Sequence, residues 1–533
     1  MTDMNIYQIW TMNGYFLTTA AIQPLFGQAA DIFGRRVPII CALSLFTLGS
    51  GLCGGSTSLQ MLIAARLIQG LGGGGLFVMT DTIAADLTPL RERMKYVRYA
   101  SSQPSAEATA TFLSTLLTAF SMIMIFFTLG SFLGPIVGGA IVVRTTWRWV
   151  FYINLPVCAV ALALVLLFLR VNHIREGTIL HRLGRVDYAG NILLVCAVVS
   201  VLIPLTWGGT TYSWKSWHIL VPLLIGITGL VFFGMHQAYI AREPTMPLRV
   251  YAHQSAFLGY IITFIHGIVL SWLSFFLPVY FQVLLEATPL MSGVYLLAIV
   301  IPLAPSGMAG GIAIAVTGHY KIIIIAGFVL LSIGIGCLTL LDANSSTANW
   351  IIFQVIAGLG GGLSLTATLP AVQAPNTEAD VAIATASWAF ARSFGAIWGA
   401  SIPSAVFNSR FDELLHRIDE PSVRQLLARG GAYEHAIRTF IKSFDGNPTL
   451  KRQIVSVYTE ALKRVWQVLI PFAIIAIPLA VWMKEVPLRE ELKTEFGLKD
   501  KKTDHDDTVS EKLSPTDTVA PKDSQPRAGT LRE

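Results

Sequence analysis

A group of charged side chains lies between two apolar blocks, in the ten-residue segment 27–36. Its sequence is GQAADIFGRR, in which Asp31 precedes the pair Arg35 and Arg36. A carboxylate and guanidinium groups this close together can form charge-assisted hydrogen bonds, while Gly27 and Gly34 permit a close helix approach and a tight turn. We predict a short turn between two helices, in which Asp31 accepts bonds from arginines or helix N-termini elsewhere and latches one conformation. The alternative is an ordinary charged turn.

Arg66 and Asp81 are the next candidates for chemistry, because both lie within a long apolar block. An arginine at membrane depth is costly unless it faces the protein interior or water. The glycine-rich run 70–75 follows Arg66 and would let another helix pack closely. We expect both residues to take part in proton coupling, with Arg66 adjusting the proton affinity of an acid, either Asp81 or one in a first helix that we expect to be missing. The alternative for Asp81 is a structural role near the cytoplasmic end of the block.

A second set of side chains suits the binding of organic molecules. Trp272, Phe276 and Tyr280 form an aromatic face that fits flat, apolar compounds, although aromatic residues near span ends also form belts at the membrane interface. Arg392 is expected either to line the same cavity or to hold an acid. Asn344 begins an Asn-Ser-Ser sequon, which predicts N-glycosylation in an external loop.

The sequence lacks the patterns of an enzyme, a metal site or a nucleotide site. Its ten histidines include no His-Glu-x-x-His pattern, and the run 70–75 lacks the Lys-Ser/Thr of a phosphate-binding loop. The five cysteines have no paired spacing and are typical of packing residues. We therefore expect no catalytic site, metal or cofactor, and an ion gradient as the energy source. The net charge of +6 is too modest to indicate binding to nucleic acid.

The elements that must position these residues are membrane helices. Of the 533 residues, 53% are hydrophobic and 13% charged, and the mean hydropathy is +0.61. Soluble domains average about 25% charged residues, so the composition excludes a water-soluble globular protein. The apolar blocks are roughly 20 residues long, enough to cross about 30 Å of hydrocarbon as helix. We predict an all-α polytopic membrane protein embedded in a lipid bilayer, with thirteen spans near 8–26, 38–56, 60–85, 123–143, 149–169, 188–207, 219–240, 257–283, 291–316, 321–341, 350–372, 382–406 and 465–483.

Lysine and arginine are concentrated in alternate loops, which predicts that these loops are cytoplasmic. The tail 484–533 is rich in charged residues, serine and proline, and we expect it to be disordered and cytoplasmic. The mixed-charge loop 407–464 then falls outside, where its helical periodicity predicts an amphipathic helix lying on the membrane or capping the mouth. An odd number of spans leaves Met1 outside, so we expect that a first helix is missing. The polar stretch 99–122 is interpreted as an insertion or, alternatively, as an amphipathic cytoplasmic loop.

Three segments in this order resemble conserved motifs of the major facilitator superfamily. Segment 27–36 resembles motif A, and the arginine with its glycine run at 66–75 resembles motif B, whose arginine is implicated in proton transfer. Segment 130–139, GSFLGPIVGG, resembles motif C, the signature of the antiporter branch. Its matching residues are Gly130, Gly134, Pro135, Gly138 and Gly139, which would form a kinked, small-faced helix.

Further matches resemble the fourteen-span drug:proton antiporter subfamily, of the fungal multidrug and toxin efflux type. They are segment 146–156 (TWRWVFYINLP), the start of a linker helix at 187–190 and its end at 207–209. The resemblance covers residues from about 7 to 485 except 99–122, and it lacks the subfamily's first helix with its Asp-x-Thr. The second-half counterpart of motif A, 311–321, has lost the acid and the usual arginine.

The resemblance implies two six-helix bundles, at 1–170 and 257–483, with two linking helices at 187–240. It implies a monomeric, proton-coupled transporter in the cell membrane that exports amphipathic organic compounds by alternating access. Three alternatives stay open: vacuolar uptake of basic amino acids, a non-transporting sensor, and a truncated product without activity. In the subfamily the first helix lines the cavity, so its loss would favour the third alternative, a truncated product without activity.

Overall fold

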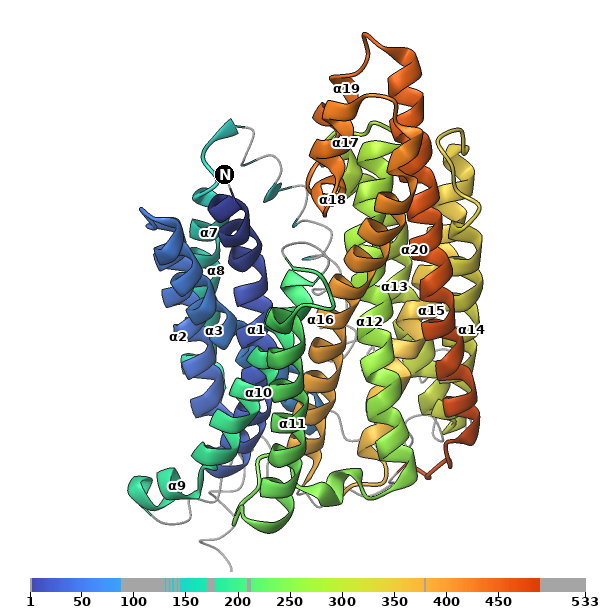
Figure 1. The fold of residues 1–533 in the computed structure, drawn as a ribbon. Helices are drawn as coiled ribbons and strands as arrows, with labels where there is room; N and C mark the ends of the chain where they lie inside the picture. The colour runs from blue at the N-terminus through green and yellow to red at the C-terminus, as the bar shows by residue number, and fades with distance from the viewer. Residues whose placement is uncertain are drawn as a thin grey trace, which may run out of the picture.

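The computed structural model describes residues 2–87, 144–169, 178–208, 212–377 and 380–488, together with residues 130, 134, 137, 138 and 141. Within these residues the long elements are all helices, arranged side by side as two groups (Figure 1). The expected span at 123–143, the stretch 99–122 and the tail from 489 lie wholly or mostly outside the described residues. Every other expected span coincides with a helix.

The first group contains the motif A segment, at the junction of its first two helices. Its helices are α1 (Thr2–Phe33), α2 (Arg36–Gly54), α3 (Leu59–Leu87), α7 (Trp149–Tyr152) and α8 (Asn154–Phe168). A short helix, α9 (Ile179–Arg185), leads to the linker hairpin, which consists of α10 (Tyr188–Trp207) and α11 (Trp217–Tyr239).

The second group follows the short helix η1 (Leu248–Tyr251). It contains α12 (Gln254–Val283), α13 (Pro289–Thr317), α14 (Tyr320–Leu338), α15 (Thr347–Gln373), α16 (Val381–Leu414) and α20 (Pro448–Trp482). Between α16 and α20, residues 415–447 form a cap made of η3 (Leu415–Arg417), α17 (Pro421–Leu427), α18 (Gly431–Glu434) and α19 (Arg438–Lys442).

Ten of the helical segments in the described part of the chain are long and apolar enough to cross a membrane. They are α2, α3, α7 with α8, α10, α11, α12, α13, α14, α15 and α20. Helices α1 and α16 are less apolar, yet they run through the bundle at the same level and pack against each other (Figure 1). The fold is therefore that of a polytopic membrane protein, in which the two less apolar helices pack against each other and against α3 and α12.

The two groups repeat one packing pattern. Helix α3 packs between α1 and α2, and α15 packs in the same way between α13 and α14. In both cases a glycine run allows the contact: a Cβ at Gly72 would overlap the backbone of Phe46, and a Cβ at Gly360 would overlap that of Leu331. Small residues let helix backbones approach closely, which is how membrane helices associate without a hydrophobic driving force.

The segment 407–464 differs in detail from the predicted amphipathic helix. Helix α16 continues to Leu414 and α20 begins at Pro448, so both extend beyond a bilayer's thickness: 35 residues of helix are about 52 Å long, against about 30 Å of hydrocarbon. The cap rests on these extensions with Ile418, Leu427 and Ile441 fully buried. The cap lies at the same end of the molecule as the start of α1, and α9 lies at the opposite end (Figure 1). We call these the cap end and the α9 end.

Candidate functional site: the contact between the two halves

Helices α1 and α16 form the main contact between the two halves, toward the α9 end. A Cβ added to Gly27 of α1 would overlap the Cβ of Ala386 in α16, so the two backbones touch at this point. About one turn nearer the cap end on α1, Gln23 Nε2 donates a hydrogen bond to Ser393 Oγ of α16 over 3.0 Å. The first residue of motif A thus lies in the contact that holds the halves together.

A charge pair crosses the same contact. Asp81 Oδ2 of α3 lies 3.9 Å from Arg392 Nη2 of α16, and the two side chains are only 18% and 22% exposed. The guanidinium group of Arg392 also lies 4.6 Å from the centre of the Trp388 ring. Among the described residues, Asp81 Oδ2 makes no hydrogen bond. The pair is therefore a long, largely enclosed contact between opposite charges, and it joins two residues that the sequence singled out separately.

The motif A turn itself is held mainly from within the first half. Gly34 has φ 77°, a left-handed conformation that a side chain disfavours. Arg35 Nη1 donates to Asp31 Oδ1 at 3.3 Å and to the carbonyl of Ala30 at 2.9 Å. Arg36 Nη2 donates to the carbonyl of Leu166 in α8 at 2.8 Å. Asp31 thus pairs with Arg35 in the same turn, and its expected latch to distant groups stays a prediction.

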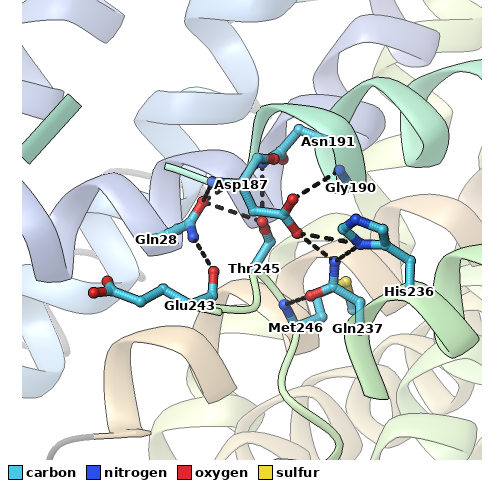
Figure 2. Close-up of polar contacts among 9 residues, drawn as sticks. All are labelled: Gln28, Asp187, Gly190, Asn191, His236, Gln237, Glu243, Thr245 and Met246. Carbon is cyan, nitrogen blue, oxygen red and sulfur yellow. Dashed lines mark hydrogen bonds and ion pairs between the residues drawn. The ribbon is translucent and has the colours of Figure 1, made fainter. Parts of the chain in front are cut away.

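The adjacent Gln28 links α1 to the linker hairpin, a role that sequence reasoning missed (Figure 2). Its Oε1 accepts a hydrogen bond from Thr245 Oγ1 at 3.1 Å, and its Nε2 donates to the carbonyl of Glu243 at 2.8 Å. Asn191 of α10 donates to Thr245 Oγ1 at 2.9 Å and to the carbonyl of Asp187 at 2.7 Å.

Asp187 completes this network at the start of α10. It caps the helix by accepting from Gly190 N at 2.8 Å, and its other oxygen accepts from Gln237 Nε2 of α11 at 2.7 Å (Figure 2). The capping position of Asp187 was visible in the sequence, because an acid before an apolar run is typical of a helix start. Its connection through Asn191 to Gln28 was not, because the partners are far apart in the chain.

Arg66 lies near the cap end and is bound within the first half. Its Nε donates to the carbonyl of Thr11 at 2.9 Å and its Nη1 donates to Gln69 Oε1 at 2.8 Å. The guanidinium group also lies 4.7 Å from the centre of the Tyr15 ring. Fifteen residues of helix separate it from Asp81, which corresponds to about 22 Å. The expected direct influence of Arg66 on Asp81 is therefore corrected: Arg392 is the charge beside this acid.

The aromatic face of α12 does not line an open space in this structure. Trp272 and Phe276 are 0% exposed and Tyr280 is 1% exposed, within the packed core of the second half. The Phe276 ring packs against Phe407 of α16, with centroids 5.8 Å apart, and Tyr280 donates to the carbonyl of Asp342 at 3.1 Å. The expectation of a cavity lining is corrected, because α12 is covered on this side by α16, α20 and the cap.

Two expected sites are only partly described. In motif C, Gly130, Gly134 and Gly138 have helical backbones, whereas Pro135 and Gly139 lie outside the described residues, so its role in helix packing stays a prediction. Asn344 is exposed in the loop between α14 and α15, where its backbone N–H donates to Asp342 Oδ1 at 2.9 Å. Its glycosylation also stays a prediction.

The sequence matches a family model and many curated proteins. Residues 6–400 match the model of the Major Facilitator Superfamily. The chain is 42% identical to the efflux pump FUS6 of Gibberella fujikuroi over 504 residues, covering 94% of this chain and 87% of the relative. It is 41% identical to the MFS-type efflux pump LUC4 of a Fusarium species, over 96% of this chain and 86% of the relative.

A third relative, the MFS-type transporter gkaD of Penicillium citrinum, is 42% identical over 93% of this chain and 81% of its own length. Among solved structures, one from a study of proton-dependent oligopeptide transporters matches with a TM-score of 0.50 and 14% identity, covering 90% of this chain and 91% of the other. At this identity the likeness concerns the fold alone.

Proposed function

Because this chain belongs to the major facilitator superfamily, we propose that it is a proton-coupled transporter that exports amphipathic organic compounds. The relatives at 41–42% identity named as efflux pumps support export as the direction of transport. In this superfamily the substrate binds between the two halves, which rock against each other to expose the site to either side. The multi-pass fold and the contact between the halves described above fit this use.

The observation that carries the coupling proposal is the charge pair between Asp81 and Arg392. It joins α3 of the first half to α16 of the second near the α9 end, which we infer to be cytoplasmic from its basic loops. In this conformation the α9 end is held together by the charge pair, by the contact of Gly27 with Ala386, and by the bond between Gln23 and Ser393. This state is therefore interpreted as closed toward the cytoplasm.

Proton binding supplies the switch in this proposal. A proton on Asp81 removes its negative charge, leaves Arg392 without its counter-ion and weakens the closed contact. The α9 end then opens, the proton leaves to the cytoplasm and an organic compound binds. The ionised Asp81 again attracts Arg392, the α9 end closes, and the compound leaves on the other side. A proton enters and a compound exits in each cycle.

The proposal is tested with the full chain in proteoliposomes, under an imposed pH gradient and with cationic, neutral and anionic fluorescent dyes. We expect flux of at least one dye that stops when a protonophore collapses the gradient. Asp81→Asn is expected to abolish the gradient dependence while leaving the protein folded. Glu420→Gln, which removes an exposed acid from the cap, is the control and should behave as wild type.

Two outcomes would contradict the proposal. Dye flux that is indifferent to the gradient in the wild type would exclude proton coupling. Gradient-driven flux that survives Asp81→Asn would exclude Asp81 as the coupling acid. Fluorescent tagging in fungal cells decides between the cell membrane, which we propose, and the vacuolar membrane, where the alternative of basic amino acid uptake would place it.

A further inference from the structure

A cavity of about 910 Å³ lies at the cap end, away from the contact between α1 and α16. Its walls come from the upper parts of α16 and α20 and from Trp214, in the loop that joins the two helices of the linker hairpin. Small-molecule sites commonly have volumes of about 300–1,000 Å³, so the cavity is large enough for an organic ligand.

The acidic and basic side chains of this cavity differ in whether they form close ion pairs. Glu413 lies 2.8 Å from Arg410, and Glu460 lies 2.8 Å from Arg417 and 3.6 Å from Arg410. Both acids of the wall are thus already paired with arginines. The neighbouring Lys463 and Arg464 also line the cavity. Neither forms a close ion pair with a described residue, although the charge of Lys463 also acts on Glu460. The cavity therefore offers two cationic groups to a ligand.

The lining changes from charged to apolar along the helix axes. The charged side chains Arg410, Glu413 and Glu460 lie nearest the cap, whereas Ala405, Val406 and Val468 lie nearer the centre of the bundle. Lys463 lies 19 residues before the end of α20 at Trp482, which corresponds to about 28 Å and to the surface of a bilayer of about 30 Å. The change in polarity thus coincides with the expected boundary between water and membrane.

We propose that this cavity binds an amphipathic organic anion. Its carboxylate or phosphate lies between Lys463 and Arg464, and its apolar part extends toward Val468 and the ring of Trp214. An exported compound and an acidic phospholipid share this chemistry and could both reach the cavity. Only one part of this inference rests on the proposed function, namely that an exported compound is one source of the anion.

The test uses the full chain in phosphatidylcholine nanodiscs and an ω-bromododecanoate probe, because bromine quenches the fluorescence of a tryptophan that it contacts. The part of the quenching that disappears in Trp214→Phe measures binding of the probe in the cavity. We expect Lys463→Gln and Arg464→Gln each to weaken binding by roughly fivefold, as for the loss of one charge-assisted bond. Arg452→Gln removes an exposed charge from the same helix outside the cavity, and it should leave binding unchanged.

Two further arms decide the identity of the ligand. The neutral ω-bromododecanol should quench Trp214 far less than the carboxylate does. Nanodiscs that contain phosphatidylglycerol show whether the headgroup of an acidic lipid displaces the probe. Displacement assigns the site to the lipid, and persistence assigns it to a free anion; both results support an anion site.

The proposal is overturned if the alcohol and the carboxylate quench equally, or if both glutamine variants bind like the wild type. Asp81→Asn, assayed in parallel, separates this inference from the proposed function. Quenching that persists while gradient-driven flux is lost supports both. In the wild type, gradient-driven flux without any quenching of Trp214 refutes only the cavity proposal.

Discussion

The turn between α1 and α2 and the turn between α13 and α14 occupy equivalent places in the two halves. Both turn on a glycine with a left-handed backbone, Gly34 at φ 77° and Gly318 at φ 74°. Both follow a helix that contains a glycine seven residues earlier, namely Gly27 and Gly311. The backbone path of the motif is therefore present in each half.

The side chains around the two turns contact different partners. The first turn holds Asp31 and Arg35, and α1 just before it touches α16 of the other half and the linker hairpin. In the second turn, His319 Nδ1 lies 3.0 Å from Glu485 Oε2, and the hydroxyl of Tyr320 accepts from Val486 N at 2.8 Å. The second turn is thus bound to the chain that follows α20, within its own half.

This difference indicates a division of labour between the halves. In the transport cycle that we propose, the first turn lies beside surfaces that separate, whereas the second lies beside surfaces that stay together. The loss of the acid and arginine from 311–321 fits this interpretation, since His319 and Tyr320 in this turn contact Glu485 and Val486 of the same half.

The largest expected effect follows from Gly27→Ala. The added methyl group overlaps Ala386, and overpacking of about 1–3 kcal/mol would shift the equilibrium away from the closed α9 end by roughly 5–150-fold. Gradient-driven dye flux should fall accordingly. Gly311→Ala is the matched control, because its methyl group would meet only Thr366 at an ordinary 3.4 Å. Equal losses in both variants would refute the division of labour.

Gln28→Leu should have the next largest effect. It removes the bonds to Thr245 and to the carbonyl of Glu243. The hydroxyl hydrogen of the buried Thr245 then loses its acceptor, at a cost of about 1–3 kcal/mol. Hydrogen exchange should rise at the start of α10 and the end of α11. The counterpart change Ile312→Leu, at the equivalent position of α13, should alter neither exchange nor stability measurably. Unchanged exchange in Gln28→Leu would show that the network does not hold the hairpin.

The two turn glycines should respond alike. Gly34→Ala and Gly318→Ala each place a side chain at positive φ, with an expected loss of about 1–2 kcal/mol in the free energy of unfolding. Thermal unfolding in detergent measures this loss. Gly336→Ala serves as the control, since this helical glycine has open space around it and alanine favours helix. A clearly larger loss at one turn would show that the two backbones are not equivalent.

The smallest expected effect concerns the contact of the second turn. Glu485→Gln weakens its interaction with His319, but the two side chains are 27% and 57% exposed, so the loss should stay within about 0.2–1 kcal/mol. Transport should be unchanged. A strong transport defect in this variant would mean that the second turn, too, moves in the cycle.

Much of the architecture could be predicted from local sequence. Hydropathy located the membrane helices because each apolar block must be long enough to cross the hydrocarbon, whatever its neighbours are. The turn at Gly34 could be predicted because a glycine there depends only on the local backbone conformation, and not on distant contacts. The motif order led to the family, which the match over residues 6–400 shows.

The contacts between elements could not be predicted in this way. Asp81 and Arg392 lie on different halves, and Gln28 and Thr245 are 217 residues apart. Whether two such side chains meet depends on how each helix is rotated about its axis, which composition and spacing do not specify. The aromatic face of α12 shows the same limit, because a helix that is apolar on every side does not reveal which side meets a cavity and which meets the core. The sequence therefore determined the helices and the turn at Gly34, and the tertiary structure decided which charges face each other across the two halves.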